Sequence, residues 1–111
     1  MTKGYVPDVG DIVWLSFDPQ AGHEQAGHRP GLVLTSAGYN AATSLMIVCP
    51  MTSRIKGNPF EVVVSREPPS AVLADHAKSL DWRARRASFK GKASPEVVGE
   101  VQARLKVLLG V

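Results

Sequence analysis

Short apolar segments follow one another between residues 12 and 80, and clusters of turn-forming residues separate them. The segments are rich in β-branched and aromatic residues, which is typical of strands. They cover residues 12–17, 31–35, 45–49, 60–64 and 71–74, with a short sixth segment at 77–80. Turn-favouring Gly, Pro, Asn and Ser residues gather at 38–40, 56–59 and 67–70. Because the pattern places no helix between these segments, it predicts a small antiparallel β-barrel.

The end of the chain changes to helical periodicity. Ser94 can cap a helix, Pro95 suits the first helical position, and Glu96 is favourable near a helix N-terminus. Gly110 can end the helix. The apolar residues between them share one helical face: Val97, Val98, Val101, Leu105 and Leu108. We expect this C-terminal helix to pack that face on the barrel.

The length and composition bound the class of protein. A chain of 111 residues, 44% of them apolar, is expected to form a single domain, residues 1–111. No apolar run approaches the roughly 20 residues that span a bilayer. The N-terminus lacks the layout of a signal peptide, so we expect a cytoplasmic protein that does not contact a membrane. The single cysteine, Cys49, lies in an apolar segment and is interpreted as a buried structural thiol.

The positive charge of the chain is unevenly distributed. Residues 1–50 carry a net charge of −2, and the remainder carries +5. Between residues 78 and 92 the only acidic residue is Asp81. Such a concentration suggests either an anionic partner, nucleic acid or an acidic peptide, or a solvated basic face. The cations of this stretch are Lys78, Arg83, Arg85, Arg86, Lys90 and Lys92.

Several common catalytic sites are missing from the sequence. It shows no Cys/His spacing for zinc and no dense carboxylate cluster for magnesium. It also has no phosphate-binding glycine loop. We therefore predict neither a metal nor another cofactor.

Three residues could act on an RNA phosphodiester without a metal. Arg29 follows a long charged loop and stands directly before Pro30, and Thr52 follows an apolar strand. If the second and third strands are neighbours, Arg29 and Thr52 share one end of the barrel and can bind one phosphate, while the ribose 2′-OH supplies the nucleophile. Glu24 in the loop could accept the 2′-OH proton. The alternative is that Glu24 and Arg29 form a loop salt bridge and Thr52 is a turn residue.

Blocks of this sequence resemble the MazF/PemK family, the mRNA-cleaving toxins of bacterial toxin–antitoxin pairs. The blocks keep the family's order and similar spacing, and cover nearly the whole chain: residues 5–19, 24–34, 50–52, 56–62, 73–75, 78–79 and 82–85. The resemblance implies a mainly β fold with helices, a CcdB/PemK-like SH3-type antiparallel barrel with a C-terminal α-helix. It also implies a homodimer that cleaves single-stranded RNA at specific sequences without a metal. The implied partner is a cognate antitoxin with an acidic segment.

The resemblance assigns roles to individual residues. Arg29 and Thr52 match the family's principal catalytic pair, and Glu24 matches a catalytic or RNA-contacting loop carboxylate. The expected RNA-binding residues are His28, Ser53, Lys56, Asp75, His76 and Lys78. The expected antitoxin-binding residues are Trp82, Arg83, Arg85 and Arg86, with simple packing as the alternative for Trp82.

Other interpretations stay open at this point. Met51, Ser53 and His76 differ from the commoner residues of the family, so the RNA sequence that is cut can differ as well. Trp14 and Phe17 are expected in the core or at a dimer interface rather than stacked on bases. Two other functions also fit the fold: a non-catalytic toxin that poisons DNA gyrase, and an SH3-like RNA-binding module.

Overall fold

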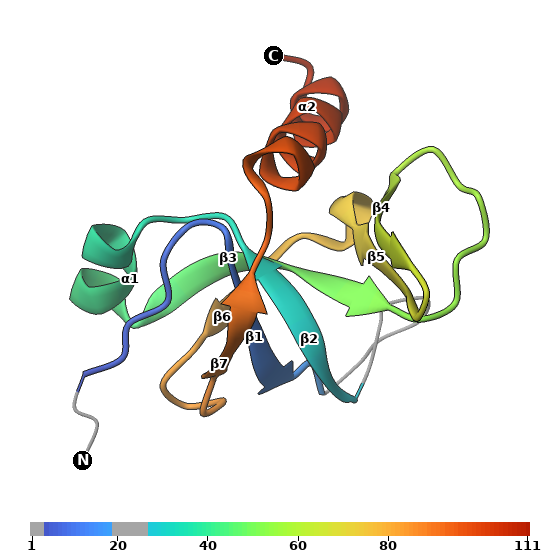
Figure 1. The fold of residues 1–111 in the computed structure, drawn as a ribbon. Helices are drawn as coiled ribbons and strands as arrows, with labels where there is room; N and C mark the ends of the chain where they lie inside the picture. The colour runs from blue at the N-terminus through green and yellow to red at the C-terminus, as the bar shows by residue number, and fades with distance from the viewer. Residues whose placement is uncertain (1–3, 19–26) are drawn as a thin grey trace.

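The computed structural model describes residues 4–18 and 27–111, which form a mainly β fold with two α-helices in the described part (Figure 1). The strands are β1 (Asp11–Ser16), β2 (His28–Val33), β3 (Leu45–Thr52), β4 (Glu61–Arg66), β5 (Pro69–Leu73), β6 (Lys78–Asp81) and β7 (Ser88–Lys92). The helices are α1 (Ala37–Thr43), the short 3-10 turn η1 (Ala74–His76) and α2 (Pro95–Leu109).

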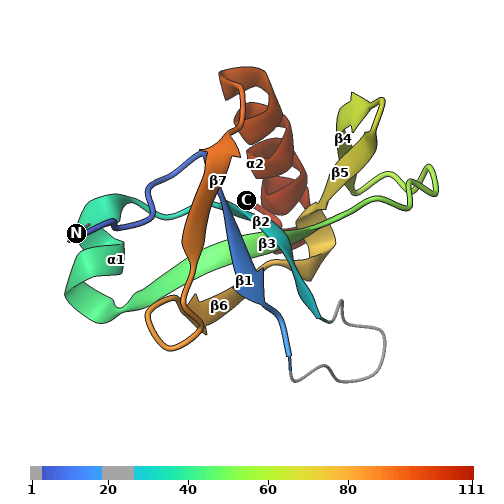
Figure 2. The same ribbon diagram turned by 60° about the horizontal axis from the view of Figure 1, so that its bottom comes forward.

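The strands form a curled antiparallel sheet in the order β4-β5-β3-β2-β1-β7, with β6 also paired to β3. Strand β3 has 8 residues and runs from α1 to the β4–β5 hairpin (Figures 1 and 2). Its first half pairs with β6, its middle with β2 and its end with β5. The sheet therefore bends around β3 into a half-barrel. This confirms the predicted fold class of a barrel-like antiparallel sheet followed by a C-terminal helix.

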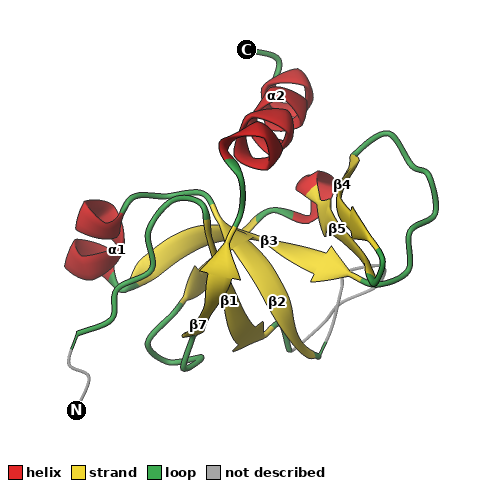
Figure 3. Cartoon of the chain, viewed as in Figure 1, coloured by secondary structure: helices red, strands yellow, loops and turns green. Residues whose placement is uncertain are grey.

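Helix α2 forms as its sequence predicts. Ser94 Oγ accepts a hydrogen bond from the backbone N–H of Val97 at 3.2 Å. Gly110 ends the helix in the left-handed conformation, with φ of 74°. The helix lies over one side of the sheet (Figure 3), and Val101 of its apolar face is fully buried. Leu108, at the far end of that face, stays 46% exposed.

The core consists of two groups of buried side chains, and alternate residues of β1 divide between them because successive side chains of a strand point to opposite faces. The group beneath α2 comprises Ile12, Leu32, Cys49, Met51, Val62, Val72, Ala74 and Val101. The other group comprises Val13, Leu15, Phe17, Val33, Met46, Val48 and Trp82. Cys49 is free and fully buried, as expected of a structural thiol, and burial raises the pKa of this thiol to about 12. Phe17 lies in the core as expected. Trp14 is exposed and is not a core residue, and its place at a dimer interface stays a prediction.

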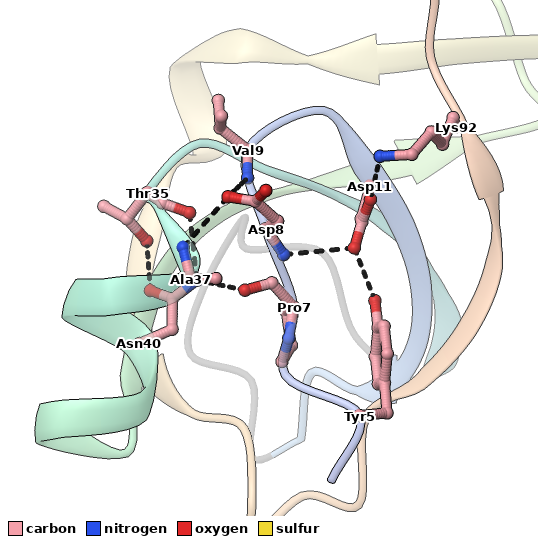
Figure 4. Close-up of polar contacts among 9 residues, drawn as sticks. All are labelled: Tyr5, Pro7, Asp8, Val9, Asp11, Thr35, Ala37, Asn40 and Lys92. Carbon is pink, nitrogen blue, oxygen red and sulfur yellow. Dashed lines mark hydrogen bonds and ion pairs between the residues drawn. The ribbon is translucent and has the colours of Figure 1, made fainter.

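The short helix α1 (Ala37–Thr43) includes residues 38–40, which the sequence pattern predicts as a turn. The buried side chain of Asn40 donates hydrogen bonds to the carbonyl oxygens of Pro7 and Thr35, at 2.8 and 2.9 Å. It also accepts one from the Thr35 hydroxyl at 2.7 Å (Figure 4). The prediction of strands without an intervening helix is wrong here. A helix of 7 residues is too short to show helical periodicity in the sequence, and these tertiary hydrogen bonds stabilise it.

Strand β7 is the second element that the sequence pattern does not predict. It pairs with β1 at the edge of the sheet. Its residues are Ser88, Phe89, Lys90, Gly91 and Lys92, and most are exposed. Lysines on an exposed edge strand hinder pairing with another chain. Because such a strand is polar, the search for apolar strand segments does not detect it.

A buried carboxylate, Asp11, joins the N-terminal segment to β1 and β7 (Figure 4). Asp11 is 3% exposed, and its side chain accepts hydrogen bonds from the Tyr5 hydroxyl at 2.8 Å and the Asp8 backbone N–H at 3.0 Å. Lys92 Nζ of β7 lies 2.7 Å from its other oxygen. Burial alone would raise the pKa of Asp11. The bonds from Lys92, Tyr5 and Asp8 outweigh that effect, so its pKa lies below the ordinary value.

Asp11→Asn is expected to lower the free energy of unfolding at pH 7 by about 1–3 kcal/mol, because Lys92 and Tyr5 lose a charged hydrogen-bond partner. A carboxyl group whose folded pKa is depressed stabilises the fold above its unfolded pKa of about 3.9. That stability is lost as the pH falls through the folded pKa. The difference between wild type and variant should therefore shrink in urea unfolding measured from pH 7 down to pH 3. The exposed carboxylate Asp75 is the control, and an Asp75→Asn effect equal to that of Asp11→Asn would contradict the account.

Candidate active site

The candidate catalytic pair lies on two neighbouring strands. In the pairing of β2 with β3, Gly31 is opposite Pro50 and Leu32 is opposite Cys49. Arg29 and Thr52 lie two residues beyond the Gly31–Pro50 pair, where the paired stretch ends, and both line the same cavity. Arg29 Nη1 donates a long hydrogen bond, 3.4 Å, to the carbonyl oxygen of Met51. The two predicted residues therefore lie side by side at the end of β3.

Glycine at position 31 is needed for this close pairing. A Cβ atom there would lie 2.7 Å from Cγ2 of Val48 and 3.0 Å from Cζ of Phe17. Both side chains belong to the buried core, so neither can move away cheaply. Gly31 therefore allows β2 to approach β3 two residues from Arg29.

A cavity of about 460 Å³ opens beside the pair. It brings together five of the residues predicted from the sequence: Arg29, Thr52, Ser53, Lys56 and His76. The other lining residues are Arg54, Asn58, Glu61 and Leu73. Because three of its lining residues are Arg or Lys and one, Glu61, is acidic, the cavity suits an anionic group.

Glu61, at the start of β4, organises the loop that carries Lys56. Its carboxylate is 8% exposed and accepts hydrogen bonds from the backbone N–H groups of Lys56, Gly57 and Asn58, at distances between 2.8 and 3.2 Å. Burial alone would raise the pKa of Glu61, but these bonds and the charge of Lys56 outweigh it and lower the pKa. Sequence reasoning assigned no role to Glu61. The available signal was a single acidic residue inside an otherwise apolar strand segment, two residues after a Gly-Asn-Pro turn.

Thr52 has the chemistry that a phosphate site requires. Its Oγ1 accepts a hydrogen bond from the backbone N–H of Arg54 at 3.0 Å. A hydroxyl that accepts such a bond keeps its own proton to donate to another oxygen. With the guanidinium of Arg29 beside it, the site can offer donors to the oxygens of one phosphate and stabilise negative charge that develops there.

The remaining predicted RNA-binding residues lie in different parts of the structure. Asp75 and His76 lie on η1, with His76 Nε2 3.9 Å from Asp75 Oδ1. His28 begins β2 and lines a second hollow that shares Arg29 and Thr52 with the first. Lys78 lines neither; it lies on β6 and borders an apolar groove next to α2. Glu24 lies outside the described residues.

The predicted antitoxin-binding residues lie in the turn between β6 and β7. Trp82 is buried, and its Nε1–H donates a hydrogen bond to the carbonyl oxygen of Asn40 at 2.9 Å. Its side chain therefore packs in the core, which was the alternative expectation. The Arg83 guanidinium lies 4.3 Å from the centroid of the Trp82 ring. Arg85 Nη1 donates to the Ser16 carbonyl oxygen at 2.8 Å. Arg83 and Arg86 are exposed.

Two further observations concern the described residues, 4–18 and 27–111. No three His, Cys, Asp or Glu side chains gather there as a metal-binding group. Neither helix of this part is both long enough and apolar enough to cross a membrane.

Comparison with known sequences identifies relatives over nearly the whole chain. A family model described as the PemK-like, MazF-like toxin of type II toxin–antitoxin systems matches residues 8–109. The chain is 48% identical over 111 residues to the endoribonuclease toxin MazF of Escherichia coli K12, covering 99% of this chain and 100% of that protein. It is 34% identical over 106 residues to the endoribonuclease PemK of Escherichia coli, covering 90% and 80%.

Solved structures are similar as well. MazF of Deinococcus radiodurans has 55% identity and a TM-score of 0.92, and the match covers 97% of this chain and 100% of that chain. A MazE–MazF structure from the same organism has 55% identity and a TM-score of 0.86, with 97% and 99% covered. These matches agree with the half-barrel fold. The chain therefore belongs to the PemK-like, MazF-like family of toxins of type II toxin–antitoxin systems.

Proposed function

We propose that this toxin is an endoribonuclease that cleaves single-stranded mRNA at a specific short sequence and needs no metal ion. The observation that carries the proposal is the pair of Arg29 and Thr52 on adjacent strands, beside a cationic cavity. Relatives matched over their full length are endoribonucleases. Since mRNA is the substrate, we infer that the toxin acts in the cytoplasm.

The reaction is a transesterification. The ribose 2′-oxygen attacks the adjacent phosphorus, the bond from phosphorus to the 5′-oxygen breaks, and a 2′,3′-cyclic phosphate and a 5′-OH end result. Arg29 and Thr52 bind the non-bridging oxygens and stabilise the phosphorane. The 2′-OH proton goes to a base, for which Glu24 is the predicted residue, and the leaving 5′-oxygen takes up a proton. His28 or a water bound by Arg29 can supply that proton, since a guanidinium is itself a poor acid.

The partner that this proposal implies is an antitoxin with an acidic, disordered segment. Relatives from Deinococcus radiodurans have been solved as MazE–MazF complexes. In this chain the exposed cations Arg83, Arg86 and Lys90 lie in and next to the turn between β6 and β7. An acidic segment that docks there would gain charge pairing to offset its loss of conformational freedom.

We also propose that the toxin is a homodimer. Strand β3 is apolar on both faces: Met46 and Val48 are buried in the core, while Leu45 and Ile47 are 37% and 39% exposed. A strand of this kind is typical of a sheet covered on both sides. Next to Ile47, an apolar groove of about 460 Å³ runs between β3 and α2. Its apolar lining residues are Leu34, Ile47, Ala77, Leu105 and Leu109. A second copy of the chain would cover this surface.

Ile47→Asp is expected to weaken dimer formation by roughly 100-fold or more, because a carboxylate would be buried against apolar groups. Sedimentation equilibrium over a range of protein concentrations measures this change. Val107→Asp is the matched control, since Val107 is 72% exposed on α2 and does not line the groove. If Ile47→Asp and wild type formed dimers equally well, the interface would lie elsewhere.

The function itself is tested by incubating the purified toxin with a long single-stranded RNA in EDTA and mapping the cut sites. The expected result is cleavage at one short repeated sequence, with 5′-OH ends. Intact RNA, from protein shown to be folded and free of antitoxin, would overturn the proposal. A gyrase-poisoning toxin or an RNA-binding module would then have to be considered.

A further inference from the structure

The loop between β3 and β4, residues 53–60, supplies much of the wall of the catalytic cavity. Four of its residues line that cavity: Ser53, Arg54, Lys56 and Asn58. Most of the loop is exposed, so the burial of apolar groups does little to fix its conformation. The place of its cationic side chains therefore depends on the hydrogen bonds that hold the loop.

The hydrogen bonds within the loop and its ends are local. The carboxylate of Glu61 accepts the backbone N–H groups of residues 56–58. Asn58 Oδ1 accepts a hydrogen bond from the backbone N–H of Phe60 at 2.8 Å. Bonds of this kind fix the shape of the loop, whereas its place at the cavity also depends on contacts with elements outside it.

Arg104 of α2 supplies such a contact. Its Nε donates a hydrogen bond to the carbonyl oxygen of Pro59 at 2.9 Å, across 45 residues of the chain. From η1, the backbone N–H of Ala74 donates to the carbonyl oxygen of Phe60 at 3.0 Å. Two consecutive carbonyl groups at the end of the loop are thus bonded to α2 and η1. These two elements pack against each other and against β4.

Glu100 orients the guanidinium of Arg104 for this bond. Arg104 Nη1 donates to the carboxylate of Glu100, one turn earlier in α2, and to the Glu100 carbonyl oxygen at 3.1 Å. The side chains of Arg104 and Glu100 are 31% and 60% exposed, and a pair this exposed adds little to stability. A surface ion pair accounts for the contacts of Nη1. The additional bond from Nε to a distant loop is not needed for the helix.

We propose that Arg104 is a positioning residue for RNA cleavage, which fixes the β3–β4 loop from α2 and thereby holds Lys56 at the cavity. Arg104 does not line the cavity, so it acts through the loop. Lys56 lies three residues before Pro59 and can pair with a phosphate of the RNA. This inference rests on the proposed endoribonuclease function and adds to it a residue of the C-terminal helix.

Amide hydrogen exchange, followed by NMR, tests the contact itself. Arg104→Met keeps the length of the side chain and removes its donors and its charge. It is expected to speed exchange of the amides of residues 56–58 about ten-fold, because the loop opens more often, and to leave the amides of β2 unchanged. Arg104→Lys keeps the charge without the planar group of donors, so it should lie between wild type and Arg104→Met. Arg66→Met removes an exposed cation outside the cavity and should exchange like wild type.

The effect on cleavage is measured with an oligoribonucleotide that has one mapped cut site. Arg104→Met should raise KM about five-fold and leave kcat nearly unchanged, because the phosphate contact of Lys56 is shared by ground state and transition state. The slope of log kcat/KM against log salt should become less steep by up to about 0.7. In a Lys56→Met background the same substitution should change KM by less than about two-fold, whereas in an Arg29→Lys background it should keep its full effect. A general loss of stability would act alike in both backgrounds.

Three outcomes would overturn the proposal: wild-type exchange of residues 56–58 in Arg104→Met, an unchanged KM, or an equal change of KM with and without Lys56. If urea unfolding shows that Arg104→Met does not fold, Glu100→Gln, which leaves Arg104 without its ion pair, replaces it in the same measurements with smaller expected effects. Failure of the proposed function is a separate result, in which wild type does not cut the oligonucleotide. The dissociation constant of the same oligonucleotide, measured by fluorescence anisotropy, then takes the place of KM. An effect of Arg104→Met that disappears in Lys56→Met supports the proposal, and an equal effect in both backgrounds overturns it.

Discussion

Arg29→Ala is expected to lower the rate of RNA cleavage by a factor of about 10²–10³ and to leave the protein folded. The guanidinium is the cationic donor next to Thr52, at the point where the two hollows meet. Its removal takes away the stabilisation of the charge that develops on the phosphorane. Arg29 Nη1 also donates a long hydrogen bond to the Met51 carbonyl oxygen, so urea unfolding of the variant is measured beside its kinetics to separate a loss of rate from a loss of stability.

Single-turnover cleavage of a mapped oligoribonucleotide measures this prediction. Arg29→Lys keeps the charge but loses the planar, two-donor geometry, so an intermediate rate is expected. Arg66→Ala, which removes an exposed arginine from the end of β4, is the control for net charge and should cleave like wild type. A fully active Arg29→Ala enzyme would contradict the assignment of Arg29 to the reaction.

Glu61→Ala is expected to lower cleavage about ten-fold or more and to lower the free energy of unfolding by about 1–3 kcal/mol. Its carboxylate accepts hydrogen bonds from the backbone N–H groups of Lys56, Gly57 and Asn58. Lys56 and Asn58 line the cavity. Without this acceptor, the loop is no longer held in one conformation, and Lys56 is no longer fixed beside the phosphate. Steady-state kinetics should show a raised KM as well as a lowered kcat, and urea unfolding gives the loss of stability.

Two variants control for this effect. Glu61→Gln keeps an acceptor oxygen without the charge and should lie between wild type and Glu61→Ala. Glu96→Ala removes an exposed carboxylate from the first turn of α2, far along the chain from the loop, and should leave cleavage unaffected. If Glu61→Ala kept wild-type kinetics, the backbone of the loop would not depend on this carboxylate.

The fold was predictable where local pattern and tertiary structure agree. The apolar strand segments and the capped helix α2 follow from composition and spacing, since burial of one face requires that periodicity. The pattern does not identify α1 or β7. Helix α1 depends on hydrogen bonds of the Asn40 side chain. Pro7 is distant from Asn40 in sequence, and the bond with the nearby Thr35 cannot be predicted without the backbone geometry. Strand β7 is an exposed edge, which needs no apolar face.

The candidate site was predictable to a similar extent. Arg29 and Thr52 stand out because they are polar residues at the ends of apolar strands, and the family resemblance connects them. Their juxtaposition depends on the register of β2 and β3, which single-sequence patterns do not specify. Lys78 was grouped with the RNA-binding residues, but β6 carries it to the groove beside α2. The proximity of Trp14 and Lys90 could not be predicted for the same reason, since β1 and β7 become neighbours only in the folded sheet.

The most direct test of the mechanism is the cleavage, in EDTA, of an oligoribonucleotide with a single 2′-deoxy substitution at the nucleotide whose 2′-OH should attack. The account predicts that the all-ribose oligonucleotide is cut to a 2′,3′-cyclic phosphate and a 5′-OH end, and that the substituted one stays intact. Cleavage of the substituted oligonucleotide at the same phosphate would contradict the account, because a water molecule or a protein group would then be the nucleophile.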